Sequence, residues 1–260
     1  MINWRILRLS LVVGTLLLAL GIPRSLLAAE LADIKRRGHI IVAVKDNFRP
    51  LGFIDNEGNL VGLEIDLARR LAEELFGDRE AVVFQPVGNQ DRLKVVLDDR
   101  VDLAIARVTA TPSRRRIVDF SPYYYLDGTS LVTKNPLIQS TTELTRATIA
   151  VLEGSATIAV IRHNLPNARL IGVKSYEEAL NVLEIEKADA FAGDRSLLAG
   201  WVQEYPDYKL LPQRLSGDPL SIVMPKGLQY ESLRQEVDRA IARWRESGWL
   251  QERIEFWGLP

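Results

Sequence analysis

The residues best suited to bind a small anion lie at 104–114, where a short buried strand leads through a threonine-rich loop to a helix start. The loop carries Thr109 and Thr111, and Arg114 follows them. A guanidinium offers a planar fork of donors that matches two carboxylate oxygens. Threonine hydroxyls and the free backbone N–H groups near a helix start add further donors. The segment therefore predicts a site for a small anionic group such as a carboxylate.

The composition argues against several other kinds of chemistry. The 260 residues include no cysteine and only two histidines, His39 and His163, which lack the spacing of metal ligands. The formal net charge is −1, so there is no general electrostatic case for binding nucleic acid. We therefore expect no metal, no cofactor, no catalytic residue and no nucleic-acid partner.

The N-terminal segment 1–29 has the layout of a secretory signal peptide. Arg5 and Arg8 precede an apolar run at 9–22, and a pair of small residues ends at Ala29. The apolar run is short for a membrane span, which needs about 20 residues. We expect export with cleavage after Ala29. An uncleaved segment that tethers the chain to the membrane is the alternative.

Strand and helix patterns alternate from residue 31 onward. Apolar β-branched runs predict strands at 40–44, 81–87, 101–106, 148–152, 169–173, 188–192 and 220–224. Amphipathic spacing predicts helices at 31–37, 64–76, 91–97, 155–164, 175–185, from about 194, and beyond 227 with Leu233, Val237, Ala240, Ile241 and Trp244 on one face. Strands separated by helices favour parallel α/β sheets, and two such runs predict two lobes.

Five motifs occur in order along the chain. They are the strand and loop at 42–53, V-G-L-E-I-D-L-A at 61–68, the stretch 101–114 with D-F-S at 119–121, the turn at 154–157, and D-A-F-A-G-D at 189–194. In order and spacing they resemble the amino-acid-binding members of the bacterial extracellular solute-binding proteins, family 3, which serve ABC transporters. Each motif alone is weak, but the resemblance covers about residues 31–257.

The resemblance implies a fold and a transport role. Such proteins have a two-lobe, type II periplasmic-binding-protein-like α/β fold. Each lobe is a mostly parallel sheet flanked by helices, and two crossover hinges join the lobes. Carried onto this chain, 30–126 and 220–260 form the first lobe and 127–219 the second. We then expect a monomeric periplasmic protein that closes around one amino acid and delivers it to the membrane permease of an ABC transporter.

The resemblance also assigns ligand contacts. Arg114 matches the arginine that binds the ligand α-carboxylate, with Thr109 beside it, and Asp194 matches the acid that binds the α-ammonium. An ammonium presents three donors, of which one carboxylate can accept two. Asp194 could instead cap the helix that follows it. Thr111 is expected to cap the helix that begins at Pro112.

Three further matches complete the predicted site. Phe48 matches a ring that lies over the bound amino acid, although a place in the hydrophobic core is the alternative. Ala156 and Thr157 could offer backbone N–H groups to the ligand from a helix start in the second lobe. An ordinary helix cap is compatible with the same two residues.

The chain departs from the family pattern near the expected side-chain pocket. Arg107 stands where the family commonly has glycine or another small residue. Many members with basic ligands carry an acid near Lys45, and an aromatic residue is often found near Asn89. Lys45, Arg92 and Arg107 would make the pocket basic, unless they pair with acids or point away. A cationic pocket favours an acidic or amide side chain over other neutral polar ones and repels lysine or arginine.

Two other functions remain open from the sequence. Some relatives of this fold dehydrate arogenate or prephenate and need an acid in the cleft, for which Glu153 and Asp194 are the candidates. The other alternative is the ligand-sensing subunit of a signalling system, which would need a separate partner chain.

Overall fold

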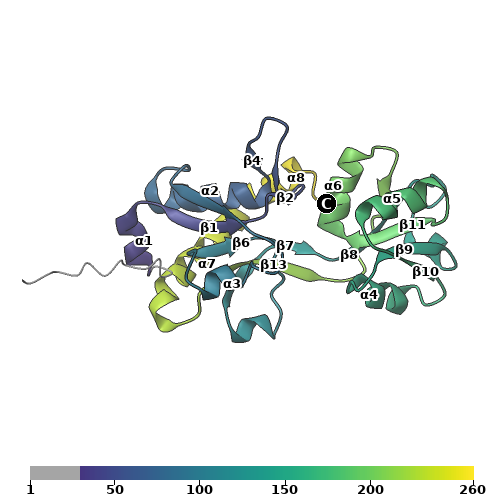
Figure 1. Ribbon diagram of the computed structural model, residues 1–260. Coiled ribbons are helices and arrows are strands. Elements are labelled where there is room, and N and C mark those ends of the chain that lie inside the picture. The colour runs from purple at the N-terminus through teal and green to yellow at the C-terminus, as the bar shows by residue number, and fades with distance from the viewer. Residues whose placement is uncertain (1–29) are drawn as a thin grey trace, which may run out of the picture.

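Two mixed β-sheets organise residues 30–260, the part of the chain that the computed structural model describes (Figure 1). The predicted signal peptide lies outside these residues. The first sheet runs in the order β5 (Val82–Pro86), β1 (Ile40–Val44), β6 (Leu103–Ile105), β13 (Asp218–Met224), β7 (Asp119–Asp127). The second runs in the order β10 (Arg169–Val173), β9 (Thr148–Leu152), β11 (Ala190–Asp194), β8 (Thr129–Thr133), β12 (Lys209–Leu210). Each sheet with its flanking helices is called a lobe below.

Both faces of each sheet are buried. Since successive strand residues point to opposite sides of a sheet, each central strand contributes to two hydrophobic clusters. In β1, Val42 and Val44 belong to the cluster beneath the helices α1 (Leu31–Arg37), α2 (Leu63–Phe76), α7 (Glu231–Glu246) and α8 (Trp249–Phe256). Ala43 between them faces the other cluster, which includes α3 (Lys94–Leu97). The five residues predicted to form one face of α7, Leu233 to Trp244, are all buried, which confirms that prediction.

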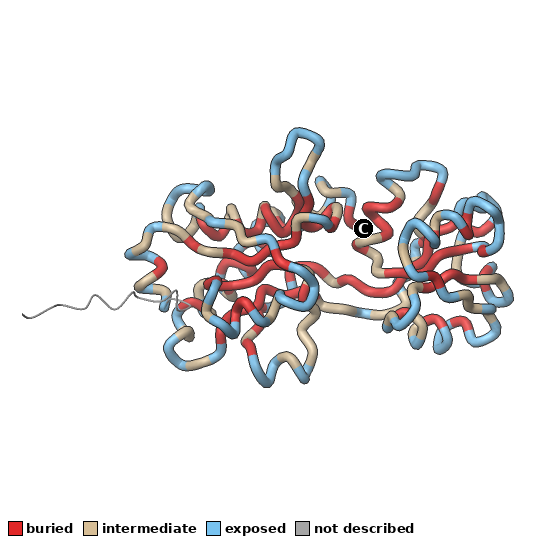
Figure 2. The backbone as a smooth tube through the Cα atoms, in the orientation of Figure 1, coloured by how far each residue is buried: buried red, intermediate tan, exposed pale blue. Residues whose placement is uncertain are grey.

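The second lobe repeats this arrangement. Phe191 of β11 packs with α5 (Tyr176–Glu184) and α6 (Arg195–Glu204). Its neighbours Ala190 and Ala192 pack on the opposite face with α4 (Thr157–Asn164). Figure 2 shows the buried strands of both sheets continuing into each other through the connection between the lobes.

Two extended segments connect the lobes. One passes from β7 to β8 through Gly128, and the other enters β13 after Ser216. The two segments touch, because a Cβ atom on Gly128 would lie 2.1 Å from the carbonyl oxygen of Ser216. Asp127 fastens this crossing to the start of α6, since its Oδ1 accepts hydrogen bonds from the N–H groups of Gly128 and Ser196, both at 2.9 Å. Burial raises the pKa of Asp127. The close approach of Gly128 to Ser216 explains why a residue without a side chain stands at the crossing.

Three local predictions need correction or completion. The segment after Pro112 forms only a short 3-10 turn at Arg114–Arg116 instead of an α-helix. The helix expected at 91–97 is α-helical only over Lys94–Leu97. A small hairpin sheet of β2 (Asn47–Phe48), β3 (Gly52–Ile54) and β4 (Leu60–Val61) projects from the first lobe beside the second (Figure 1). Within residues 30–260, no helix is long and apolar enough to cross a membrane.

Candidate functional site

A cavity of about 370 Å³ lies between the two lobes. It is lined from the first lobe by Asn89, Arg92, Arg107, Thr109 and Arg114, from the second by Leu152, Ser155, Ala156, Thr157, Tyr176, Ala192, Gly193, Asp194 and Leu197, and at the crossovers by Asp127, Asp218 and Leu220. Among them, Leu152 ends β9, Asp194 ends β11, and Arg107 lies two residues beyond the end of β6. Ligands of α/β sheets commonly bind outside such carboxyl ends of strands.

Arg114 and Thr109 lie together on the first-lobe wall. The Nη1 group of Arg114 donates to the carbonyl oxygen of Thr109 at 2.9 Å, and Thr109 pairs with Leu220 of β13. The hydroxyl of Thr111 accepts the N–H of Arg114 at 3.3 Å, the contact expected of a cap. The Nη2 group of Arg114 has no hydrogen-bond partner among residues 30–260. The arginine is thus held in place with donors left over for an anion.

Arg107 has an unusual backbone conformation. Its φ angle is 53°, in the left-handed region that glycine adopts freely and other residues rarely adopt. The glycine that the family resemblance implies at this position would adopt the conformation without strain. The backbone N–H of Arg107 donates to Oε1 of Glu64 at 2.6 Å, and the same oxygen accepts from the hydroxyl of Tyr124. Glu64 is fully buried, and that burial raises the pKa of its carboxyl group.

The side chain of Arg107 crosses the cavity to the second lobe. Its Nη2 group forms an ion pair with Oδ2 of Asp194. Its guanidinium also lies over the ring of Phe48, 4.3 Å from the ring centre. Asp194 occupies the N-cap position of α6, but its side chain makes no capping hydrogen bond and is directed to Arg107 instead. The sequence alone did not predict this ion pair.

Arg92 and Lys45 have different environments. Arg92 lines the cavity, and its guanidinium donates to the carbonyl oxygens of Asn89 at 3.0 Å and Ala106 at 3.1 Å. Burial, followed by the charge of Arg107, lowers its pKa. Lys45 does not line the cavity: it is 5% exposed, and its Nζ donates to the carbonyl oxygen of Val87 at 2.8 Å. Burial lowers its pKa as well. Of the three basic residues expected at the side-chain pocket, Arg92 and Arg107 line the cavity and Lys45 does not.

The second-lobe wall is the start of α4 and the end of β11. Ala156 and Thr157 line the cavity at the helix start, as expected. Ser155 also lines it, and its buried hydroxyl has no hydrogen-bond partner among the residues that the structure describes. Sequence reasoning missed Ser155 and Glu64, although both lie inside motifs that it had identified. Within 30–260, no cluster of three or more metal-ligating side chains is present.

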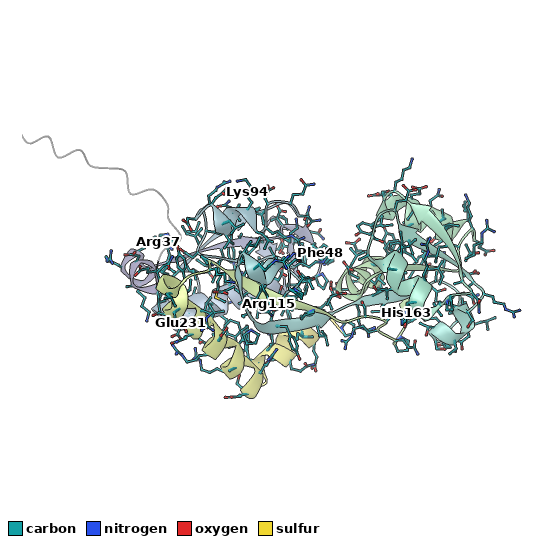
Figure 3. The ribbon with its side chains drawn as sticks, turned by 90° about the horizontal axis from the view of Figure 1, so that it is seen from below. Arg37, Phe48, Lys94, Arg115, His163 and Glu231 are labelled. Atoms are coloured by element: carbon teal, nitrogen blue, oxygen red, sulfur yellow. The ribbon has the colours of Figure 1, made fainter. Side chains whose placement is uncertain are left out.

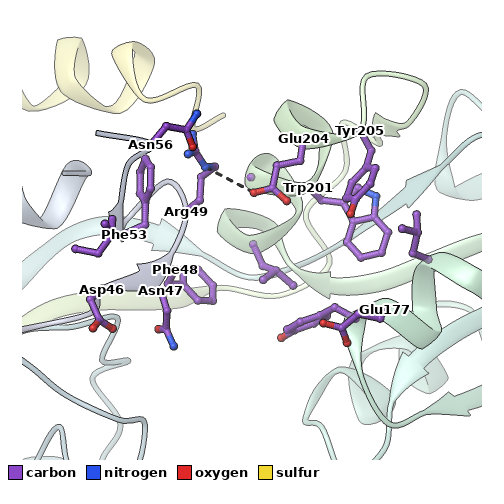
Figure 4. A pocket seen from close by; sticks show the side chains of 15 residues that line it. Asp46, Asn47, Phe48, Arg49, Phe53, Asn56, Glu177, Trp201, Glu204 and Tyr205 are labelled. Atoms are coloured by element: carbon purple, nitrogen blue, oxygen red, sulfur yellow. Dashed lines mark ion pairs between the residues drawn. The ribbon is translucent and has the colours of Figure 1, made fainter. Parts of the chain in front are cut away.

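A second cavity of about 530 Å³ lies at the mouth of the cleft (Figure 4). It shares Tyr176 and Leu197 with the first cavity, and Phe48 lines this one instead of the first. Figure 3 shows Phe48 on the side of the first lobe that faces the second. Arg49 from the hairpin sheet forms an ion pair of 3.7 Å with Glu204 of α6 (Figure 4). The lobes thus contact each other both inside the cleft and at its mouth.

Residues 40–260 match the family of bacterial extracellular solute-binding proteins, family 3. The chain belongs to this family. The glutamine-binding protein of Geobacillus stearothermophilus is 32% identical over 195 residues, or 74% of each chain. The ABC transporter glutamine-binding protein GlnH of Bacillus subtilis (strain 168) is 28% identical over 230 residues, or 87% of this chain and 84% of its own.

The fold is confirmed by comparison with solved structures. An ancestral cationic amino acid solute-binding protein (AncCDT-1) superposes with a TM-score of 0.76 at 25% identity, covering 88% of this chain and 100% of that one. The chain has the type II periplasmic-binding-protein fold that the resemblance implied. Its sheets are mixed instead of mostly parallel, because each has antiparallel as well as parallel neighbours.

Proposed function

We propose that this family member is the amino-acid-binding component of an ABC transporter and holds a polar L-amino acid in the cavity between its lobes. One observation carries the proposal: the cavity brings Arg114 and Thr109 from one lobe opposite Asp194 from the other. A guanidinium matches an α-carboxylate and a carboxylate matches an α-ammonium. The names of the two glutamine-binding relatives support the same ligand class.

An acidic or amide side chain is the preferred ligand feature in this proposal. Arg92 and Arg107 bring two guanidinium groups to the cavity besides Arg114. Two of the three aspartates that line the cavity already accept hydrogen bonds from the protein: Asp127 from Ser196 and Asp218 from the hydroxyl of Ser216. The guanidinium groups therefore have donors available for the ligand. Ligand carboxylate or amide oxygens accept from such donors, whereas an ammonium is repelled by them.

The protein binds its ligand without transforming it in this proposal. Glu153, one of the two acids considered for a dehydratase, is exposed and does not line the cavity. The other, Asp194, is paired with Arg107. We further propose a monomer that is exported to the periplasm, closes as two bodies formed by 30–126 with 220–260 and by 127–219, and passes the amino acid to a membrane permease.

Thermal melting of purified residues 30–260 with each of the twenty L-amino acids tests the proposal. Since ligand bound to the folded state raises stability by mass action, a hundredfold excess over Kd shifts a chain of this size by roughly 5–10 °C. We expect such a shift with an acidic or amide amino acid. If no amino acid shifts the melting temperature, the proposal is wrong. Phenylpyruvate formed from prephenate would instead establish the dehydratase alternative.

A further inference from the structure

Arg107 occupies a backbone position that disfavours every side chain. Its φ angle of 53° is one that glycine adopts without strain. Its N–H is nevertheless fixed at 2.6 Å on Oε1 of the buried Glu64, so this conformation is built into the first lobe. An arginine at such a position indicates that its side chain contributes something that glycine cannot.

The contacts of the guanidinium show what that contribution involves. It is ion-paired with Asp194 across the cleft and lies over the ring of Phe48. The side chains of Arg107 and Asp194 are only 20% and 34% exposed. The ion pair therefore fills the place where the proposed function puts the ligand ammonium.

We propose that Arg107 determines ligand specificity by exchanging partners. In the empty cleft its guanidinium is bound to Asp194. When an amino acid enters, its α-ammonium takes the place of the guanidinium on Asp194. The released guanidinium then binds the side chain of the ligand. This inference rests on the proposed function and identifies the ligand class as L-amino acids with a side-chain carboxylate, followed by those with a side-chain amide.

The exchange favours acidic ligands because both charges of the broken ion pair regain a partner. The ammonium neutralises Asp194, and the side-chain carboxylate neutralises Arg107. An amide accepts a hydrogen bond from the guanidinium but offers no charge, so it compensates less. An apolar side chain leaves a partly buried guanidinium without a partner, which is costly. The ring of Phe48 offers the guanidinium a favourable surface while it changes partners.

Calorimetric titration of Arg107 variants with glutamate, aspartate, glutamine and serine tests the exchange. Arg107→Gln keeps a side chain of similar length without the charge, and Arg107→Gly suits the left-handed backbone. Both are expected to lose about tenfold to hundredfold in affinity for the acidic ligands, the value of a charge-assisted hydrogen bond. Their affinity for serine is expected to stay or rise, because Asp194 is no longer occupied. The control Arg116→Gln removes the same charge from an exposed site outside the cavity and should leave all affinities unchanged.

The outcomes separate this inference from the proposed function. If the wild type binds an amino acid but the Arg107 variants change acidic and serine affinities by the same factor, the exchange is wrong and the proposed function stands. If the wild type binds no amino acid, both are wrong. Melting of the unliganded wild type, Arg107→Gln, Asp194→Asn and the double variant gives an independent reading. We expect non-additive shifts that reveal the ion pair, and additive shifts would overturn the exchange.

Discussion

The two walls of the cleft are built differently. On the first-lobe wall, Arg92 and Arg114 are fixed by backbone carbonyl oxygens of their own lobe. On the second-lobe wall, the hydroxyl of Ser155 has no partner within 30–260, and Asp194 is paired only across the cleft with Arg107. The first wall is thus preorganised for an anion before the lobes close. The polar groups of the second wall, in contrast, depend on partners from the ligand or the first lobe. We infer that the ligand carboxylate binds to the first lobe, and that the second lobe then closes as the ligand ammonium binds to Asp194.

The largest expected effect comes from removing the preorganised wall. Arg114→Ala takes away the guanidinium fork proposed to hold the α-carboxylate. Truncating one partner of a buried, hydrogen-bonded charge pair costs about 30-fold to more than 1,000-fold in affinity. We therefore expect calorimetry to detect no binding of the best wild-type ligand at micromolar concentrations.

The control for this variant is Arg116→Ala, which lies two residues further along the same turn and is exposed. It should bind the ligand like the wild type. Affinity retained in Arg114→Ala would show that the carboxylate binds elsewhere and would reverse the roles assigned to the two walls.

A smaller loss is expected on the second wall. Asp194→Asn removes the charge that accepts the ammonium but also frees Arg107, so the two changes partly offset each other. We expect affinity to fall about tenfold to hundredfold. The matched control is Glu204→Gln, which neutralises the other ion pair between the lobes, at the exposed mouth. Surface pairs contribute little, so its affinity should change less than about fivefold. If Asp194→Asn and Glu204→Gln lowered ligand affinity equally, Asp194 would have no special role in binding the ligand.

The unpaired hydroxyl of Ser155 provides a finer test of the second wall. If the ligand supplies its missing partner, Ser155→Ala loses one neutral hydrogen bond, worth about two- to tenfold in affinity. The melting temperature of the unliganded protein should stay the same, because the hydroxyl has no partner there. A variant that melts lower without ligand but binds as tightly would assign Ser155 a structural role.

The smallest expected effect concerns the support beneath the first wall. Burial raises the pKa of Glu64 above its ordinary 4.5, so the folded protein holds this proton more tightly than the unfolded chain does. Its stabilising contribution is therefore present below pH 4.5 and is lost as the pH rises through the folded pKa. Glu64→Gln never ionises and still accepts the N–H of Arg107 through its amide oxygen.

The melting temperature of Glu64→Gln relative to the wild type should consequently rise by a few degrees between about pH 4.5 and 8. A matched melting series at constant ionic strength measures this difference. If the melting temperature of Glu64→Gln instead fell relative to the wild type as the pH rose, Glu64 would be stabilised as a carboxylate, contrary to the effect of its burial.

Much of the fold follows from periodicity in the sequence. Strand 40–44 and the buried face of α7 were predicted residue by residue, because regular burial leaves a local pattern. The helix expected after Pro112 was not formed. Only the 3-10 turn at Arg114–Arg116 forms there, because the chain is held against β13 through Thr109 and Ala110 just before it and enters β7 at Asp119 just after it.

The site was predicted less completely, because its decisive contacts join distant residues. Arg107 was recognised as a departure from similar proteins, but its pairing with Asp194 spans 87 positions. Glu64 reaches Arg107 over 43 positions, and neither contact leaves a periodic pattern. Lys45 shows the opposite error: the family resemblance suggested a place in the pocket, whereas its ammonium donates a hydrogen bond to the carbonyl oxygen of Val87. Only the folded arrangement distinguishes a basic residue that faces a ligand from one that serves the backbone.

A crystal structure of residues 30–260 with the tightest-binding amino acid tests the account most directly. We predict that the α-carboxylate lies on the guanidinium of Arg114, that the α-ammonium lies on the carboxylate of Asp194, and that Arg107 has turned to the ligand side chain. A ligand bound away from Arg114, or an intact ion pair between Arg107 and Asp194 beside a bound ligand, would contradict it.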